Sequence, residues 1–356
     1  GGGSFFYSRR IGEKVSVSND LLENDQQVFN FDETPQLLNS IKVTGTTNRN
    51  LSIGFLNAIT DKVEAEVKNS SSNQKRKQTI QPSVNYNVIS LSQQLLNNYS
   101  SISLLNTNKT GRDGLYGNNV AFVADFFDDN RDFNIKVKAF GSKTPAENSK
   151  NGFRSGISFS ELKGNFRYNF SWWGVDKHYK QNELGYFNFQ DHQRFSSRIG
   201  YQILNEYGFL REYSNYLWFN DTRTFHSFDR KLWGLRFGND FSTQNLMVFE
   251  ADFAYSSKTR DYDKPRTINR FIEEPENFQS KLVMQSNKNK DFSYRIQWNN
   301  FAYFKEDFKE QKSQNRLNLF MLYRFSEQFS LELESDHLNF KDDVGYLKTI
   351  NQDIYF

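Results

Sequence analysis

Residues 165–175 read N-F-R-Y-N-F-S-W-W-G-V and alternate aromatic with polar side chains. Phe166 and Tyr168 fall on one side of an extended chain and Arg167 and Asn169 on the other, because successive side chains of a β-strand point to opposite faces. The stretch therefore predicts a strand with one aromatic face and one polar face. Its length of about ten residues suits a tilted strand that crosses the hydrocarbon layer of a membrane.

The same alternation recurs, over a similar length, in residues 194–203, 231–241, 291–300 and 314–325. Residues 207–220 depart from it, because apolar side chains occupy both faces there. A bulge near Ser214 would reconcile the two halves of this segment, and a wholly buried strand is the alternative.

The composition narrows the class further. Aromatic residues make up 17% of the 356 residues, yet the mean hydropathy is only -0.77. The sequence has no run of about 20 apolar residues, which excludes a helical membrane bundle. Zero cysteines exclude disulfides and thiolate zinc sites, and a net charge of +3 is too balanced to indicate nucleic-acid binding. An all-β protein remains, either a soluble sandwich or solenoid or a membrane barrel.

The predicted connections alternate between short and long. Short ones lie near residues 48–50, 96–98, 128–131, 163–164, 205–207, 242–245, 287–290 and 326–328. Long ones lie near residues 61–81, 108–117, 142–151, 176–193, 221–230, 257–277 and 305–313. Outer-membrane barrels alternate in this way, because successive hairpins lie on opposite sides of the membrane.

The pattern therefore predicts an all-β, transmembrane, antiparallel up-and-down β-barrel of about 18 strands, within a range of roughly 14 to 22. We expect it in the bacterial outer membrane, with extracellular long loops and periplasmic short turns. One barrel domain would occupy residues 41–356. Residues 1–40 would form a leading segment with a first strand over residues 5–18, which makes the strand count even, and a polar loop.

The aromatic face of the predicted strands is expected to contact lipid. Aromatic residues near strand ends are favoured at the two membrane interfaces, where an amphipathic ring lies between lipid and water. The residues expected there are Trp173, Trp218, Trp233, Tyr255, Trp298 and Tyr303. The alternative is that these aromatics fill the core of a soluble β-protein.

The opposite face carries the candidate functional residues. We expect seven charged side chains in the lumen: Arg167, Arg198, Arg236, Arg295, Arg316, Arg324 and Glu332. Arg324 and Glu332 lie on the two arms of one tight hairpin, which favours an ion pair across the strands. We expect these charges to solvate a water-filled or plugged lumen, and a basic stripe that selects anionic solutes is the alternative.

The sequence offers no motif for catalysis, metal binding or a cofactor. His178, His192, His226 and His337 show no His-x-x-x-His spacing, so we predict no metal, no cofactor and no catalytic residue. Residues 75–77, K-R-K, are expected in a solvated external loop, and contact with lipopolysaccharide phosphates is the alternative.

Several short stretches carry a resemblance to a known family. They are F-F-Y-S-R-R-I-G at residues 5–12, I-K-V-T-G at 41–45, L-S-I-G-F-L-N-A-I-T at 51–60 and S-I-S-L-L-N at 101–106. Together they resemble large outer-membrane proteins of Bacteroidota, in which a sandwich similar to a carbohydrate-binding module precedes a C-terminal barrel described as a domain of unknown function. The resemblance covers mainly the first third of the chain. It implies that residues 8–12 lie at the barrel entrance and that the chain is part of a longer protein, and it carries over no catalytic residue.

These observations favour an integral outer-membrane β-barrel that acts in binding or transport, or as a scaffold of an outer-membrane assembly, without catalysis. A pore for anionic or oligosaccharide solutes and an outer-membrane enzyme with a loop-borne site are the alternatives. The expected partners are outer-membrane lipid and lipopolysaccharide. Other outer-membrane proteins and a saccharide are further candidates, and no nucleic acid is expected.

Overall fold

A computed structural model describes residues 5–17, 26–69, 74–112, 114–144, 151–181, 183–187, 189–261, 271–304, 312–341, 348–350 and 353–355. Over these ranges the chain is almost entirely extended. The one helical element among them is the 3-10 turn η1 (Ser8–Arg10), and they contain no α-helix. No helix within the described ranges has the length and apolar character to span a membrane.

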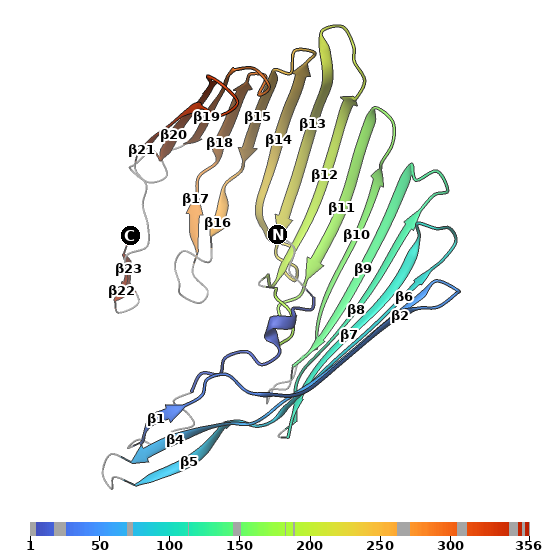
Figure 1. Ribbon diagram of the computed structural model, residues 1–356, viewed down its shortest axis with the longest axis vertical. Helices are drawn as coiled ribbons and strands as arrows, with labels where there is room; N and C mark the ends of the chain where they lie inside the picture. Colours follow the sequence, from blue (N-terminus) through green and yellow to red (C-terminus); the bar gives the residue numbers. More distant parts are fainter. Residues whose placement is uncertain are drawn as a thin grey trace. The chain divides into compact units, whose positions relative to one another are not determined.

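Sixteen strands form one sheet in the order β2-β3-β6-β7-β8-β9-β10-β11-β12-β13-β14-β15-β18-β19-β20-β21 (Figure 1). The strands are β2 (Leu37–Thr46), β3 (Leu51–Thr60), β6 (Val84–Gln94), β7 (Ser101–Gly111), β8 (Gly114–Phe127), β9 (Phe133–Lys143), β10 (Asn151–Glu161), β11 (Phe166–Val175), β12 (His192–Ile203), β13 (Leu210–Arg223), β14 (Arg230–Thr243), β15 (Val248–Ser256), β18 (Asn277–Gln285), β19 (Phe292–Tyr303), β20 (Ser313–Arg324) and β21 (Ser330–Lys341). Each strand pairs with the next sheet strand along the chain, which is the up-and-down antiparallel topology. The predicted all-β class is confirmed, and the strand number falls inside the predicted range.

Three small sheets lie outside the large one. They are β1 (Gln26–Phe31) with β4 (Val63–Asn69) and β5 (Lys75–Gln81), β16 (Thr259–Asp261) with β17 (Ile272–Glu274), and β22 (Lys348–Ile350) with β23 (Asp353–Tyr355). Two of these sheets use strands from connections predicted to be long, those between β3 and β6 and between β15 and β18. These two connections are therefore long, as predicted.

The connection predicted at residues 108–117 is wrong. Strands β7 and β8 continue through it until Gly111 pairs directly with Gly114. Polar residues such as Asn108 and Lys109 stay in the strand, because Asn118 and Gly117 complete the backbone ladder opposite them. Side-chain polarity alone does not end a strand.

The first strand predicted over residues 5–18 is also wrong. The described part of this segment contains η1 and a turn at Gly12, whose φ of +69° lies in the left-handed region that favours glycine. A backbone hydrogen bond joins Tyr7 N to Leu184 O at 2.7 Å, so the segment is held by a loop and not by strand pairing. Ser18 lies outside the described residues.

The irregularity predicted near Ser214 lies a few residues earlier, where the register of β13 with β14 shifts between Leu210 and Glu212. The register of β13 runs unbroken through Ser214, which faces Gln202 on one side and Asp240 on the other. The strand begins only at Leu210, after a tight turn in which Gly208 has a φ of +61°. The turn thus removes residues 207–209 from the strand, and the register shift between Leu210 and Glu212 marks the start of the regular ladder with β14.

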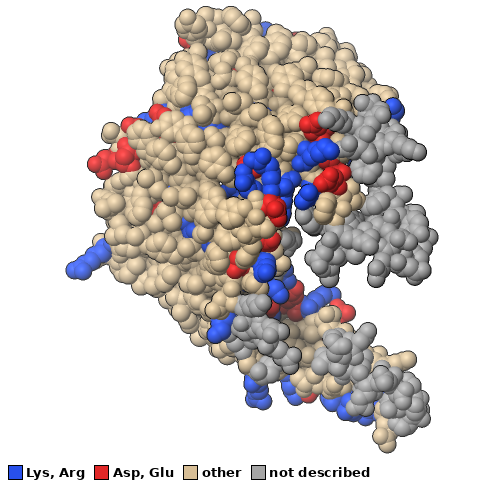
Figure 2. Space-filling model, turned by 180° about the vertical axis from the view of Figure 1, so that it is seen from behind, with Lys and Arg blue, Asp and Glu red and all other residues tan. Residues whose placement is uncertain are grey.

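One face of the sheet is apolar and exposed. Every strand of the sheet except β15 carries at least one large hydrophobic side chain that is more than a third exposed. Register places these side chains together, as in the row Ile199, Leu217 and Phe237 and the row Leu282, Trp298 and Leu317. Figure 2 shows wide areas of surface without charged side chains and a limited part where Lys, Arg, Asp and Glu gather. We call these two sides of the sheet the apolar face and the polar face.

The predicted positions of the aromatic residues hold only in part. Trp233 and Tyr255 contact each other near one end of their strands, with ring centroids 5.2 Å apart. Trp218, however, stands opposite Arg198 and Arg236 on the polar face. Trp298 lies in the middle of β19 and not near a strand end, where it was predicted. Alternation fixes which side chains share a face, but not how far along the strand each one lies.

Contacts divide the chain into two compact units. Unit 1 comprises Gly1–Asn130, Asn134–Ile157 and Trp173–His192, and unit 2 comprises Arg131–Phe133, Ser158–Trp172 and Gln193–Phe356.

Candidate functional site

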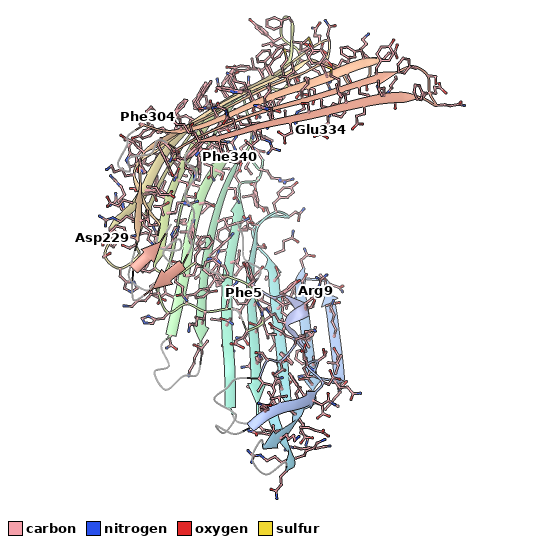
Figure 3. The ribbon with its side chains drawn as sticks, turned by 90° about the vertical axis from the view of Figure 1, so that its left-hand side faces the viewer. Phe5, Arg9, Asp229, Phe304, Glu334 and Phe340 are labelled. Carbon is pink, nitrogen blue, oxygen red and sulfur yellow. The ribbon has the colours of Figure 1, made fainter. Side chains whose placement is uncertain are left out.

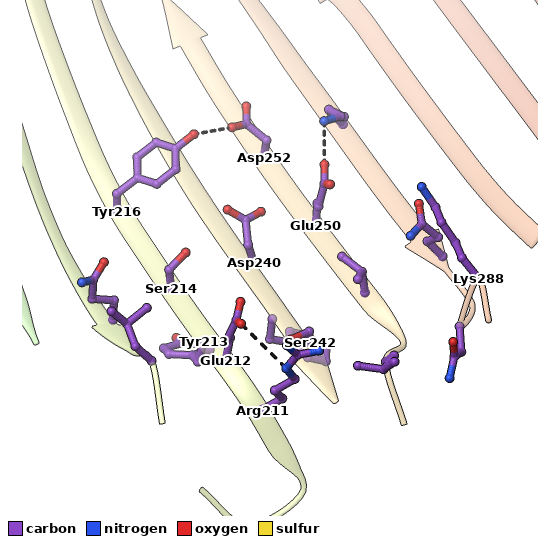
Figure 4. A pocket seen from close by; sticks show the side chains of 18 of the residues that line it. Arg211, Glu212, Tyr213, Ser214, Tyr216, Asp240, Ser242, Glu250, Asp252 and Lys288 are labelled. Atoms are coloured by element: carbon purple, nitrogen blue, oxygen red, sulfur yellow. Dashed lines mark hydrogen bonds and ion pairs between the residues drawn. The ribbon is translucent and has the colours of Figure 1, made fainter. Parts of the chain in front are cut away.

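The polar face of unit 2 carries a hollow of about 820 Å³ (Figure 4). It lies over β12 to β15 and β18, where register brings alternate residues of each strand to the same face. Its charged lining residues are Arg211, Glu212, Arg236, Asp240, Glu250, Asp252, Lys281 and Lys288. Cations and carboxylates are therefore equal in number, so the hollow is polar without a strong net charge.

Tyr216 is the centre of this site. Its hydroxyl donates a hydrogen bond to Asp252 Oδ2 at 2.8 Å, and the Arg198 guanidinium lies 4.0 Å from the ring centroid. Arg236 Nε donates to both oxygens of Asp252, at 2.7 and 2.8 Å. The Asp252 carboxylate thus joins the Tyr216 phenol and the Arg236 guanidinium across three strands, which fixes the orientation of all three groups.

Glycines on both neighbouring strands make room for the Tyr216 side chain. Gly200 and Gly238 stand directly opposite it on β12 and β14. A Cβ at Gly238 would lie 2.3 Å from the ring of Tyr216, so the ring lies across β14 only because residue 238 has no side chain. This places the hydroxyl beside Asp252 on the next strand.

Three further carboxylates line the same hollow, those of Glu212, Asp240 and Glu250. Glu250 accepts from Lys281 Nζ at 2.7 Å. Asp240 lies between Ser214 and Glu250 in Figure 4, and among the described residues its carboxylate makes no hydrogen bond or ion pair. A second hollow of about 350 Å³ is lined by Arg167, Arg198 and Tyr216, so Tyr216 borders both hollows.

The structure places the seven predicted residues as follows. Arg198 and Arg236 flank Trp218 in one row of the polar face, and Arg167 lines the second hollow with Arg198. Arg295 donates to Gln297 at 2.7 Å. Arg316 Nε donates to Asp336 at 2.9 and 3.1 Å.

The expected pair of Arg324 and Glu332 does not form. Arg324 Nη1 instead donates to the carbonyl oxygens of Lys288 and Lys290, at 2.8 and 3.1 Å, which anchors the neighbouring turn. Glu332 stands opposite Leu322, two residue pairs along the ladder from the pair of Arg324 with Ser330. Glu334 and Phe340, labelled in Figure 3, also project from this edge strand, β21.

In unit 1 the polar face is covered by two segments of the chain. One is the described part of residues 176–191, which connects β11 to β12 and buries Tyr179, Leu184 and Phe187. The other is the leading segment, whose Phe6 and Ile11 pack on a cluster that includes Leu184. Phe5 and Arg9 mark its course in Figure 3.

Close contacts fix the connection between β11 and β12 on the sheet of unit 1. Lys109 Nζ contacts Glu183 Oε2 at 3.0 Å, and Lys180 N donates to Ser142 Oγ at 2.9 Å. A Cβ at Gly152 would lie 2.3 Å from the backbone of Tyr179, so only glycine allows this approach. Burial raises the pKa of the Tyr179 phenol well above its usual range, and the neutral hydroxyl donates to Gln181 at 2.5 Å.

Sequence reasoning missed the acidic half of the hollow and the inward course of residues 176–191. Glu250 and Asp252 alternate with Phe249 and Phe253, so the period-two rule that selected the arginines would have found them. Tyr179 and Phe187 carry no such signal, because they lie in a polar connection.

Within the described ranges no three His, Cys, Asp or Glu side chains gather in a way that could hold a metal ion. The K-R-K tract of residues 75–77 lies exposed on β5.

A family model, described as "Domain of unknown function (DUF5916)", matches residues 2–356. The chain belongs to this family. The search of curated proteins gives no match. A solved structure, "Crystal Structure of Pseudomonas aeruginosa OccK10 (OpdN)", is similar with 9% identity and a TM-score of 0.37, covering 74% of this chain and 88% of that one. The family description and the fold leave the role of the chain to be inferred from its two faces.

Proposed function

We propose that the chain is an integral outer-membrane β-barrel protein that binds or passes solutes along its polar face, without catalysis. The observation that carries the proposal is the exposed apolar face, which extends over nearly all strands of the large sheet. Soluble monomers rarely expose contiguous apolar patches larger than a few hundred Å². Lipid would cover this face, and lipopolysaccharide would contact the long connections.

Aromatic clusters near both ends of the strands support a membrane position. Phe253, Phe278 and Phe304 contact one another in a chain near the end with long connections. Phe292 and Tyr323 pair near the end with short turns. Ala302 of β19 pairs with Phe278 and is ten residues from Phe292. Ten residues extend about 34 Å along a strand, which corresponds to about 26 Å along the membrane normal at a tilt of about 40°. An outer-membrane barrel has an apolar band of about 25 Å, flanked by aromatic girdles.

The orientation of the proposed barrel follows from the connections. Short turns would face the periplasm and long connections the exterior, because outer-membrane barrels are built in this way. The resemblance to Bacteroidota proteins with a module similar to a carbohydrate-binding domain supports a saccharide as a further partner and a role beside other outer-membrane proteins. Co-purification from native membranes would identify these partners.

The test of the proposal is extraction and gel migration. We expect the protein to leave membranes only with detergent and to run faster on a gel before boiling than after, because a folded barrel resists the detergent. A protein that partitions into buffer without detergent would overturn the proposal.

A solute pore is the second candidate, and the arginines of the polar face favour it. Rings or stripes of arginine select anions in pores. Single-channel recordings in planar bilayers would measure conductance, and Arg198→Gln and Arg295→Gln should each shift anion selectivity. A channel with unchanged selectivity in both variants, or no conductance at all, would count against this function.

A further inference from the structure

Arg154 of unit 1 is a half-buried cation that is held by aromatic rings. It lies on β10, with its guanidinium carbon 4.8 Å from the ring centroid of Phe140 on β9 and 4.3 Å from that of Phe187 in the covering connection. Rings attract the charge of a guanidinium, but they offer no lone pair to its N–H groups. Among the described residues, no acceptor meets those N–H groups, so five strong donors are left for another partner.

A second cation lies beside it without a carboxylate of its own. Lys138 lies two residues before Phe140 on β9, so it shares a face with the ring that Arg154 contacts. The charged groups that act on Lys138 are Lys136, Arg154 and Asp125. Asp125 is already engaged, because Lys136 Nζ contacts it at 2.7 Å and Asn134 Nδ2 donates to it at 2.7 Å. Three cations therefore share one carboxylate, and the excess positive charge lies at Lys138 and Arg154.

The surroundings strengthen this charge for a small anion. Phe187 packs in a cluster with Val175 and Tyr179, and Phe140 and Trp173 border it. These apolar side chains shield one side of the Arg154 guanidinium from water, which strengthens a charge-assisted hydrogen bond to it. The phenol of Tyr179 is neutral and donates to Gln181, so it supplies no counter-charge. Lys138 itself is exposed, which leaves the place open to solvent.

We propose that Arg154 and Lys138 form a binding site for one small oxyanion, a carboxylate, sulfate or phosphate group, on the polar face of unit 1. The planar guanidinium presents two parallel N–H donors that match the two oxygens of such a group, and the lysine adds a point charge beside them. The site rests on the proposed function and deepens it, because it names a small oxyanion as one solute that the polar face binds.

The experiment is calorimetric titration of the full chain, folded in detergent, with inorganic phosphate at constant ionic strength. We expect saturable binding of one phosphate, weakened about tenfold in Arg154→Gln and several-fold in Lys138→Gln. Arg154→Lys keeps the charge and loses the fork, so its affinity should fall between those of the wild type and Arg154→Gln.

The matched control is Lys42→Gln, which removes the same charge from the same face of unit 1. Lys42 is on β2, opposite Leu56 of β3. Strand β2 is five strands from β9, or about 24 Å across the sheet, which exceeds the Debye length of about 8 Å. Its affinity should equal that of the wild type. Absent binding in the wild type, or equal weakening in Lys42→Gln and Lys138→Gln, would overturn the site.

Two arms distinguish the source of the anion. Acetate and inorganic phosphate represent free solutes, and micelles doped with phosphatidylglycerol represent a lipid headgroup. The arm in which the wild type binds more tightly identifies the source of the anion. That difference between the arms should disappear in Lys138→Gln if the site is the one proposed. Heat-dependent gel migration of every variant checks folding separately, so a failed site and a failed membrane proposal give different results.

Discussion

Replacing Gly238 by alanine should break the network at Tyr216 without disturbing the backbone. The new Cβ would lie 2.3 Å from the Tyr216 ring and 2.7 Å from its hydroxyl oxygen. These atoms are the far end of a side chain, so the ring moves and the strand does not. The movement loses the hydrogen bond to Asp252 and the contact with Arg198.

The magnitude follows from those two interactions. A hydrogen bond to a charged group contributes about 1.5–3 kcal/mol, and an exposed cation–π contact about 0.5–1 kcal/mol. Because the hollow is open to solvent, we take the lower part of each range. We therefore expect Gly238→Ala to lower the free energy of unfolding by about 2–3 kcal/mol.

A double-mutant cycle isolates the cause. In a Tyr216→Ala background the ring is gone, and Gly238→Ala should then be neutral or stabilising by up to about 0.5 kcal/mol, because glycine weakens a strand interior. Gly45→Ala on β2 is the control, since a Cβ there would meet nothing within 4 Å. Its effect should stay within about 0.5 kcal/mol.

The assay is urea unfolding of the detergent-folded protein, followed by tryptophan fluorescence and by gel migration. The coupling energy between positions 216 and 238 should be about 2 kcal/mol or more. If Gly238→Ala costs the same in both backgrounds, within about 0.5 kcal/mol, the clash with Tyr216 is not the cause of its effect.

Three other perturbations test the remaining features. Gly152→Ala should displace the connection between β11 and β12, because its Cβ would meet the Tyr179 backbone. Trypsin cleavage of this connection at Lys177 and Lys180 should then speed up about tenfold. An unchanged cleavage rate would refute the contact. Burial raises the pKa of Tyr179, so the stability it confers is complete below about pH 10, the ordinary value of an unfolded tyrosine, and is lost as the pH rises further. Subtilisin cleavage of this connection should therefore increase from pH 8 to pH 10.5 in the wild type and much less in Tyr179→Phe; equal increases would exclude the phenol as the cause. Leu217→Arg, in the middle of the apolar face, should destabilise the protein by about 2–4 kcal/mol in lipid vesicles, against about 0–1 kcal/mol for Leu331→Arg near a short turn; equal costs would contradict a lipid-facing surface.

The sequence predicted much of the sheet, because period-two alternation is a local property of each strand. Residues 165–175 and 314–325 were predicted within one residue of β11 and β20. Prediction failed where polarity was taken to mean a loop, as between Asn108 and Gly117, and where apolar residues in a turn were taken to mean a strand, as at residues 207–209. In both cases the backbone hydrogen-bond ladder decided the outcome, and single residues do not encode it.

The candidate site shows the same division. Alternation selected Arg198 and Arg236 as members of the polar face, but their partners depend on register between strands. Asp252 meets Arg236 and Tyr216 only because three strands align in one way, and Gly238 leaves the space that the ring needs. Likewise, Arg154 meets Phe187 only because a connection more than twenty residues further along the chain folds back over β10.

The sequence by itself thus determined the class of fold, the two chemically different faces and the balance of charge. Each follows from the period of side chains along one extended segment. The tertiary structure alone decided which charges are neutralised by partners, which remain open at Asp240, Lys138 and Arg154, and which part of the polar face is covered. Those properties depend on distances of a few ångströms between segments far apart in the chain, and pairing register and loop packing set those distances.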